Sequence, residues 1–255
     1  MAKKSLFVLY GISIYLVFFA VFLYLIGFVG NFLVPKTIDT GTSSNLILSI
    51  GVNLLLVSLF GLSHSIMARP SFKAWWTRIV PKEIERSTFV LVASITLIVL
   101  FLFWQPIETT IWDMTGTVFA PLMWVGFWAG WVIVLISTYL INHFDLFGLR
   151  QVYLVARDKA YTPVGFIVRG FYHFMRQPMM FGMLLAFWCI PMMTAGHLLF
   201  ATAMTVYIFI GIHYEERDLE KELGTDYIAY KERTGMFVPN LAPTPPSDVV
   251  DVPAS

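Results

Sequence analysis

The first candidate for chemistry in this 255-residue chain is a histidine near the end of an apolar segment. His64 is the only titratable side chain in the uncharged stretch 40–68, and Arg69 follows about one helical turn later. Desolvation and a neighbouring arginine both favour a neutral imidazole, which can accept a proton from a substrate. The competing interpretation is a helix-end histidine bonded to a backbone carbonyl. We therefore predict His64 as a catalytic base with Arg69 beside it, and keep the structural alternative open.

A second group of polar and aromatic residues runs from Asn142 to Arg150 and includes His143. It directly follows another uncharged stretch, so its donors and acceptors could line a polar pocket at the membrane boundary. Aromatic and basic residues also anchor helices at the membrane surface, and that interpretation fits equally well.

Two further clusters flank the long uncharged stretch 177–214. Arg176 lies two residues before Pro178, and the X-Pro step predicts that a helix begins there. The unpaired N–H groups of a helix N-terminus, with an arginine close by, suit a carboxylate. Glu215 and Glu216 follow the stretch and could bind an amine, a cation or a ribose; a solvated, salt-bridged helix is the alternative.

The elements that must position these clusters are membrane helices. Hydrophobic residues make up 58% of the chain and charged residues 13%, against about a quarter charged in a soluble domain. Uncharged stretches as long as a bilayer is thick predict an all-α, polytopic transmembrane bundle of about six helices. We place them at 6–29, 46–67, 87–104, 118–141, 178–192 and 196–213.

The fifth helix is short, so five spans with a re-entrant pair remain possible, and Pro191 and Gly196 should bracket a tight turn. We expect one domain over residues 1–240 and a Pro-rich, disordered tail over 241–255.

The basic residues predict the orientation of the bundle. On the helix boundaries above, 16 of the 17 Lys and Arg residues fall on one side, and only Lys36 falls on the other. Short loops rich in Lys and Arg stay in the cytoplasm. We therefore expect both termini and the four clusters on the cytoplasmic face of a membrane, which we take to be a bacterial inner membrane.

The composition also argues against several classes of protein. A single cysteine, Cys189, excludes an internal disulfide and a thiolate zinc site, and we expect no metal centre. A net charge of +1 argues against nucleic-acid binding. No internal repeat supports an inverted-repeat transporter.

The last two clusters resemble the signature of the isoprenylcysteine carboxyl methyltransferase superfamily of membrane methyltransferases. In that family Arg-His-Pro opens a helix hairpin, followed by Glu-Glu-x-x-Leu, Gly-x-x-Tyr-x-x-Tyr and a final proline. The corresponding residues here are Arg176-Gln177-Pro178, Glu215-Glu216-Arg217-Asp218-Leu219, Gly224-Thr225-Asp226-Tyr227-Ile228-Ala229-Tyr230 and Pro239. Glutamine replaces the histidine of the family pattern.

Earlier segments are similar to the NnrU-type branch and its methanethiol S-methyltransferases. The matching stretches run from His64 to Lys73, from Glu85 to Ser87 and from Asn142 to Gln151. This resemblance implies transfer of a methyl group from S-adenosylmethionine to methanethiol, giving dimethyl sulfide and S-adenosylhomocysteine. Such a protein needs a lipid bilayer and a small thiol as partners, and we expect no nucleic acid and no obligate protein partner.

The resemblance and the charges of the donor together suggest which residues hold S-adenosylmethionine. From the C-terminal signature, the expected contacts are Arg176, Pro178, Gly182, Glu215, Glu216, Tyr227 and Tyr230. From the second cluster and the chain that follows it, they are His143, Arg150 and Tyr161.

Two alternatives remain. A haem-binding electron-transfer protein would use histidine pairs, yet only His64 and His213 lie within predicted helices and no Cys-x-x-Cys-His occurs. A membrane scaffold or transporter would bind no S-adenosylmethionine.

Overall fold

The computed structural model describes residues 2–162, 164–166 and 168–238. Five of its helices are long and apolar enough to cross a membrane: α1 (Ala2–Gly30), α2 (Leu46–Ala68), α4 (Lys82–Phe103), α5 (Ala120–Ile141) and α9 (Ala195–Leu223). A sixth apolar helix, α8 (Pro178–Trp188), has 11 residues. At 1.5 Å per residue it reaches only about half the thickness of a hydrocarbon core. The predicted all-α polytopic bundle is confirmed.

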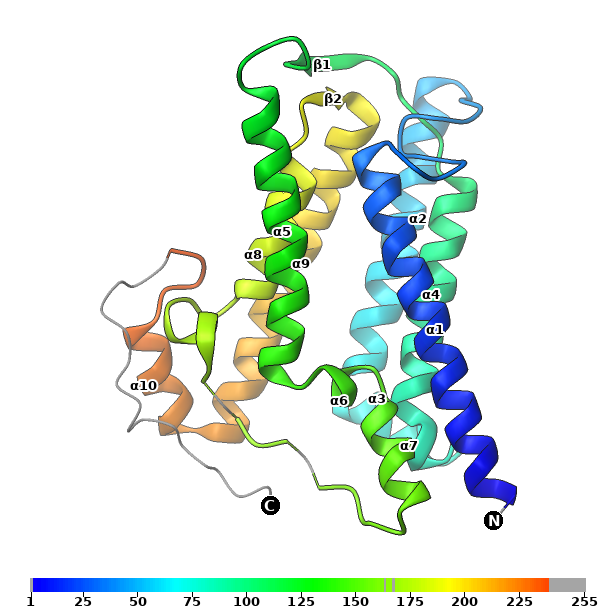
Figure 1. The fold of residues 1–255 in the computed structure, drawn as a ribbon, viewed down its shortest axis with the longest axis vertical. Coiled ribbons are helices and arrows are strands. Elements are labelled where there is room, and N and C mark those ends of the chain that lie inside the picture. Colours follow the sequence, from blue (N-terminus) through cyan, green and yellow to red (C-terminus); the bar gives the residue numbers. More distant parts are fainter. Residues whose placement is uncertain (1, 163, 167, 239–255) are drawn as a thin grey trace.

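Shorter elements connect these helices. They are α3 (Pro70–Trp76), α6 (His143–Leu146), α7 (Leu149–Ala156), the 3₁₀ turn η1 (Gly170–His173), α10 (Thr225–Arg233) and the strands β1 (Thr110–Asp113) and β2 (Met192–Thr194). The N-terminus, α3, α6, α7 and α10 lie toward one end of the bundle, and the two strands lie at the other (Figure 1). The short helices therefore gather at the end that carries most of the basic residues.

Helix boundaries differ from the sequence-based prediction, most clearly at the ends of the last two helices. The fifth helix ends at Trp188 rather than 192, and the expected tight turn is instead β2, whose Met193 pairs with Trp112 of β1. The backbone groups of residues 192–194 are satisfied by this strand pairing instead of a helix, which ends the helix early. The last long helix continues past 213 to Leu223. The predicted tail at 241–255 lies outside the described residues.

The helices form two groups. α1, α2 and α4 pack together with α7, whereas α5 packs on α8, and α9 contacts both α2 and α8. At the strand end a buried cluster joins the groups, with Phe28 and Trp104 on one side and Phe187 and Phe200 on the other. Large apolar side chains therefore fill the bundle near the strand end.

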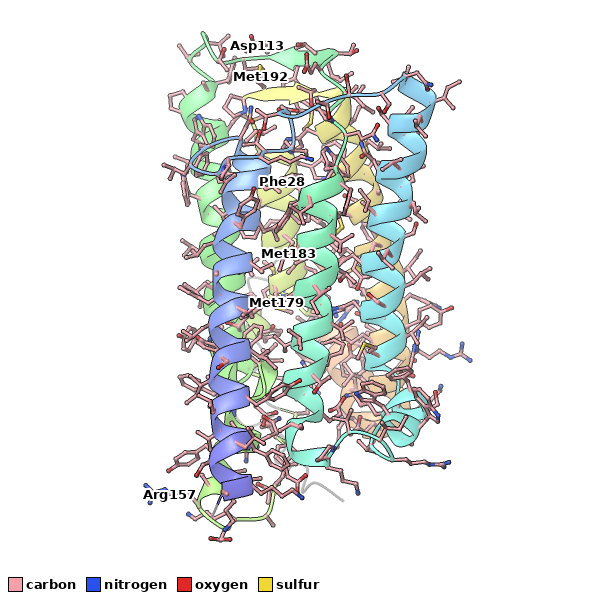
Figure 2. The ribbon with its side chains drawn as sticks, turned by 90° about the vertical axis from the view of Figure 1, so that its right-hand side faces the viewer. Phe28, Asp113, Arg157, Met179, Met183 and Met192 are labelled. Carbon is pink, nitrogen blue, oxygen red and sulfur yellow. The ribbon has the colours of Figure 1, made fainter. Side chains whose placement is uncertain are left out.

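The short helix α8 begins inside the bundle rather than at its end. Figure 2 shows Met179, in the first turn of α8, about midway along the long axis, with Met183 and Phe28 above it. The helix lies tightly against α5, because a Cβ at Gly182 would be only 2.6 Å from the Gly130 carbonyl oxygen. The N–H groups at the start of α8 therefore lie deep in the bundle.

A second close approach brings the α6–α7 turn onto α4. Gly148 has φ of 85°, which favours glycine, and a Cβ there would lie 2.7 Å from the backbone nitrogen of Ser87. Ser87 is in the second turn of α4. This contact places the residues of α6 next to the first turn of α4, where a polar pocket lies.

Candidate active site at the basic end of the bundle

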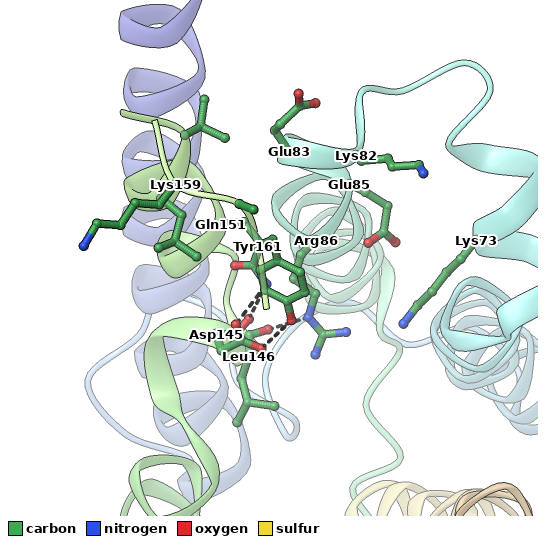
Figure 3. Close-up of a pocket in the computed structure, with 13 residues that line it drawn as sticks. Lys73, Lys82, Glu83, Glu85, Arg86, Asp145, Leu146, Gln151, Lys159 and Tyr161 are labelled. Carbon is green, nitrogen blue, oxygen red and sulfur yellow. Dashed lines mark hydrogen bonds between the residues drawn. The ribbon is translucent and has the colours of Figure 1, made fainter. Parts of the chain in front are cut away.

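A polar pocket of about 630 Å³ opens between α3 and α4 on one side and α6, α7 and the following chain on the other. Its size suits a small-molecule ligand. Figure 3 shows side chains of both charge signs around it. The cations are Lys73, Lys82, Arg86 and Lys159, and the carboxylates are Glu83, Glu85 and Asp145.

Arg86 forms part of the inner wall of this pocket. Its Nε donates a hydrogen bond of 2.7 Å to the Leu146 carbonyl, and its guanidinium carbon lies 4.7 Å from the centre of the Phe89 ring. The His64 ring is 4.8 Å from the same Phe89 ring. Arg86 is the charged side chain whose field acts on His64. The structure thus brings His64 of α2 and Arg86 of α4 to one aromatic ring.

His64 retains a free ring nitrogen. Its Nδ1 is buried and has no hydrogen-bond partner among the described residues. The ring packs against Phe60 and Phe89 instead of capping a helix end through that nitrogen. An imidazole in this setting can still accept or donate a proton at Nδ1.

Arg69 is engaged elsewhere. Its Nη1 lies 3.3 Å from a carboxylate oxygen of Asp218, and its guanidinium carbon lies 4.2 Å from the centre of the Tyr214 ring. Both partners belong to α9. Arg69 therefore joins the end of α2 to α9, although it is the arginine nearest to His64 in the sequence.

Asp145 organises the opposite wall of the pocket. It accepts hydrogen bonds from Arg150 at 2.9 Å and from the Tyr161 hydroxyl at 3.2 Å. Arg150 also donates to the Thr162 carbonyl at 2.8 Å. Burial raises the pKa of Tyr161, and the Asp145 carboxylate raises it further. The predicted donor-binding residue Tyr161 thus lines the pocket, and Arg150, also predicted, is tied to it through Asp145.

His143 has no free nitrogen to offer a ligand. Its Nε2 is 2.8 Å from the Tyr15 hydroxyl, its Nδ1 is 2.9 Å from the Thr138 hydroxyl, and its ring stacks on Tyr139 at 4.3 Å. The residue is buried, and burial lowers its pKa. These contacts hold α6 against α1 and α5. His143 therefore helps to position α6, which carries Asp145 of the pocket.

The predicted residues of the C-terminal signature form a second cluster beside the start of α8. Arg176 and Glu216 make an ion pair of 2.9 Å, with side chains 9% and 6% exposed, and Lys231 lies 3.0 Å from the other Glu216 oxygen. Arg176 also donates to the Lys231 and Thr234 carbonyls. The cluster locks α9 and α10 to the chain that leads into α8.

Tyr227 and Tyr230 of α10 add further contacts to this cluster. Both are buried, and the Tyr230 hydroxyl donates a hydrogen bond of 2.7 Å to the Tyr172 carbonyl. Pro178 is buried at the first position of α8, and Gly182 lies at the contact with α5. These four residues are packed in the interior and do not line the polar pocket.

Glu215, unlike the neighbouring Glu216, is exposed. At 100° per residue it lies on α9 between the face that packs on α2, where Tyr207 meets Gly61, and the buried face that carries Ile212. Glu215 is therefore accessible on α9 between these two faces.

Two side chains near the start of α8 lie close to Glu215. Gln177 interacts with the Glu215 carboxylate. Burial raises the pKa of Tyr172, and the Glu215 carboxylate raises it further. Gln177, at the family's histidine position, thus retains a hydrogen-bonding side chain directed at this glutamate.

Sequence reasoning did not select Arg86, Lys73 or Asp145 as site residues. One signal for Arg86 was available, because it is the last charged residue before the uncharged stretch 87–105. It therefore stands at the membrane boundary of α4, as Arg69 stands at that of α2.

A second cavity of about 590 Å³ lies on the far side of α7, between α7 and α1. Its lining is mainly apolar and includes Val8, Ile12, Phe144 and Val152. Leu154 lines both cavities. The helix α7 therefore separates an apolar groove from the polar pocket.

Comparison with known proteins identifies relatives that cover nearly the whole chain. A methanethiol S-methyltransferase of Mycobacterium tuberculosis is 48% identical over 93% of this chain and 97% of its own length. Methanethiol S-methyltransferase 1 of Bradyrhizobium diazoefficiens is 51% identical over 91% of this chain and 81% of its own length. The methanethiol S-methyltransferase of Crocosphaera subtropica is 44% identical over 93% of both chains.

No family model and no solved structure matches the chain. The relatives match it across both the His64 segment and the C-terminal signature, and the apolar helices make it an integral membrane protein. This chain belongs to the methanethiol S-methyltransferase family.

Proposed function

We propose that this protein transfers a methyl group from S-adenosylmethionine to methanethiol, giving dimethyl sulfide and S-adenosylhomocysteine. The observation that carries the proposal is the identity of 48% to a methanethiol S-methyltransferase over 93% of the chain. The polar pocket and the histidine with a free nitrogen supply a setting for that reaction.

The charges of the pocket fit the methyl donor. S-adenosylmethionine supplies an electrophilic methyl group on its sulfonium and carries a carboxylate and an ammonium group. Lys73 and Lys82 can bind a carboxylate. Glu85 and the exposed Glu215 can bind cationic groups. One face of the Tyr161 ring is covered by the Arg150 guanidinium at 5.3 Å, so only the opposite face is left for a cation.

We assign a positioning role to the buried part of the signature. Arg176 and Glu216 bind each other and Lys231, and Tyr227 and Tyr230 pack behind them. This arrangement fixes the position of Glu215, which is one residue before Glu216 on α9. His143 and Arg150 fix α6 and Asp145 in the same way. The donor then touches Glu215 and the pocket side chains, while the buried residues hold them in place.

His64 acts as the base in this proposal. Thiols are weak acids that react as thiolates, so methanethiol is mostly protonated at neutral pH. The free Nδ1 of His64 accepts the thiol proton, and the Phe89 ring beside it gives the small apolar substrate a surface to contact. Arg69 holds the end of α2, which carries His64, against α9 through Asp218.

The test combines activity with donor affinity. Purified protein receives S-adenosylmethionine and a panel of thiols, and methylated sulfides are measured in the headspace. His64→Gln should lower the rate at neutral pH by about 10²–10⁴, leave S-adenosylhomocysteine affinity unchanged, and recover activity as rising pH deprotonates the thiol.

His213→Gln is the matched control, because His213 is exposed at the same end of the bundle. Absence of dimethyl sulfide with the unmodified protein would refute the function. Full activity of His64→Gln at neutral pH would refute only the role of the histidine.

We also propose that the site faces the cytoplasm, with both termini on that side, in a bacterial inner membrane. The basic residues of the short helices support this orientation, and S-adenosylmethionine is made in the cytoplasm.

A further inference from the structure

Arg86 differs from the other arginines at the candidate site in having no carboxylate partner. Arg69, Arg150 and Arg176 each have a carboxylate oxygen at 2.9–3.3 Å. Among residues 2–162, 164–166 and 168–238, no carboxylate lies within 4.0 Å of the Arg86 guanidinium. A guanidinium at a membrane boundary is costly unless it meets an anion or water.

The charges around Arg86 come from every element packed against it. Three acidic groups act on Arg86: Glu85 on α4, Asp145 on α6 and Tyr161 in the chain after α7. Asp145 is already shared by Arg150 and Tyr161. The anions near Arg86 are therefore either committed to other donors or too distant to form a pair.

Two more groups near Arg86 are basic. Burial lowers the pKa of Lys73, and the nearby Arg86 lowers it further, while Glu85 opposes this effect. His64 lies within the field of Arg86 from α2. Four cations and three carboxylates line the pocket, so its net charge is positive, which favours a small anion.

The orientation of the Arg86 guanidinium is fixed. Its Nε is used by the Leu146 carbonyl, and its plane lies over Phe89. A guanidinium has five N–H donors, so the donors on the two terminal nitrogens are left for a ligand. His64 contacts the same Phe89 ring. A proton acceptor, a free guanidinium edge and an apolar ring therefore converge at one place.

Resting on the proposed function, we propose that Arg86 is a catalytic residue that binds the sulfur of methanethiol as its thiolate, while the methyl group of the thiol contacts Phe89. The S–H bond breaks and its proton moves to His64. A sulfur lone pair then forms a bond to the donor's methyl carbon, and the electrons of the broken C–S bond stay on the donor's sulfur.

Arg86 lowers the cost of forming the thiolate next to a membrane, because a charge-assisted hydrogen bond replaces water around the sulfur. The same contact selects a small thiol. A larger substituent would have to share the Phe89 surface with the His64 ring and the Arg86 guanidinium.

The test uses Arg86→Gln and Arg86→Lys in the purified full-length protein. We expect Arg86→Gln to reduce kcat/KM for methanethiol about ten- to a hundredfold at neutral pH, the loss expected for one charge-assisted hydrogen bond. The loss should shrink as pH rises and the thiol ionises in solution. Arg86→Lys should recover part of the activity. S-adenosylhomocysteine affinity, measured by calorimetry, should be unchanged.

Arg78→Gln removes the same charge from an exposed position outside the pocket and should behave as the unmodified protein. If Arg86→Gln does not fold, the Arg86→Lys rate and affinity data decide the question. Weakened S-adenosylhomocysteine binding with an unchanged pH profile would show that Arg86 binds the donor, and would overturn the inference. Full activity of Arg86→Gln would overturn it too, whereas an unmodified protein that methylates no thiol would refute the function itself.

Discussion

Replacing Glu216 by glutamine should destabilise the protein more than it weakens donor binding. Removing one partner of a buried ion pair costs about 3–5 kcal/mol, because the other charge is left without compensation. The side chains of Arg176 and Glu216 are 9% and 6% exposed, so they qualify as buried. Arg176 keeps two carbonyl acceptors and Lys231 keeps Glu220. We therefore expect the lower end of the range, about 3 kcal/mol.

This loss corresponds to a large change in thermal unfolding. A chain of this size shifts its Tm by about 2–4 °C for each kcal/mol, so Glu216→Gln should unfold about 6–12 °C earlier in detergent. Glu220→Gln is the matched control, since Glu220 binds the same Lys231 from an exposed position and should change Tm little.

A double substitution distinguishes a structural role of Glu216 from direct contact with the methyl donor. If the pair is structural, Arg176→Gln combined with Glu216→Gln should cost less than the two single changes added together, because no unpaired charge remains. An unchanged Tm for Glu216→Gln, accompanied by a loss of S-adenosylhomocysteine affinity, would refute the positioning role and support direct donor contact.

Three further predictions follow from the packing and the charges. Gly182→Val should reduce the monodisperse fraction in size-exclusion chromatography, because its Cβ would lie 2.6 Å from the Gly130 oxygen, whereas Gly211→Ala, with open space around it, should not. Since the pKa of His143 is lowered by burial, the unfolded chain binds more protons below pH 6.5, so Tm should fall as pH drops from 6.5, and His143→Gln should flatten that dependence. Reporter fusions should indicate the cytoplasm at residues 78 and 159 and the opposite side at 112; a reversed signal at 159 would contradict the proposed orientation.

The sequence alone determined the class of fold. A bilayer requires long uncharged helices whose backbone groups bond internally, so composition and hydropathy identified α1, α2, α4 and α5 within a few residues. The local X-Pro signal also placed the start of α8 at Pro178. The C-terminal signature predicted that Arg176 and Glu216 act together, and the structure joins them in one ion pair.

Only the tertiary structure decided which arginine shares an aromatic contact with His64. Arg69 is five residues away in the sequence, but its backbone is extended at the end of α2 and its side chain reaches α9. Arg86 is 22 residues away, yet it meets His64 across Phe89 because α2 and α4 pack side by side. The early end of α8 depends likewise on pairing between β2 and the distant β1. Local sequence reports helix length and burial, whereas the neighbours of a side chain depend on how separate helices pack, and that information is spread over the whole chain.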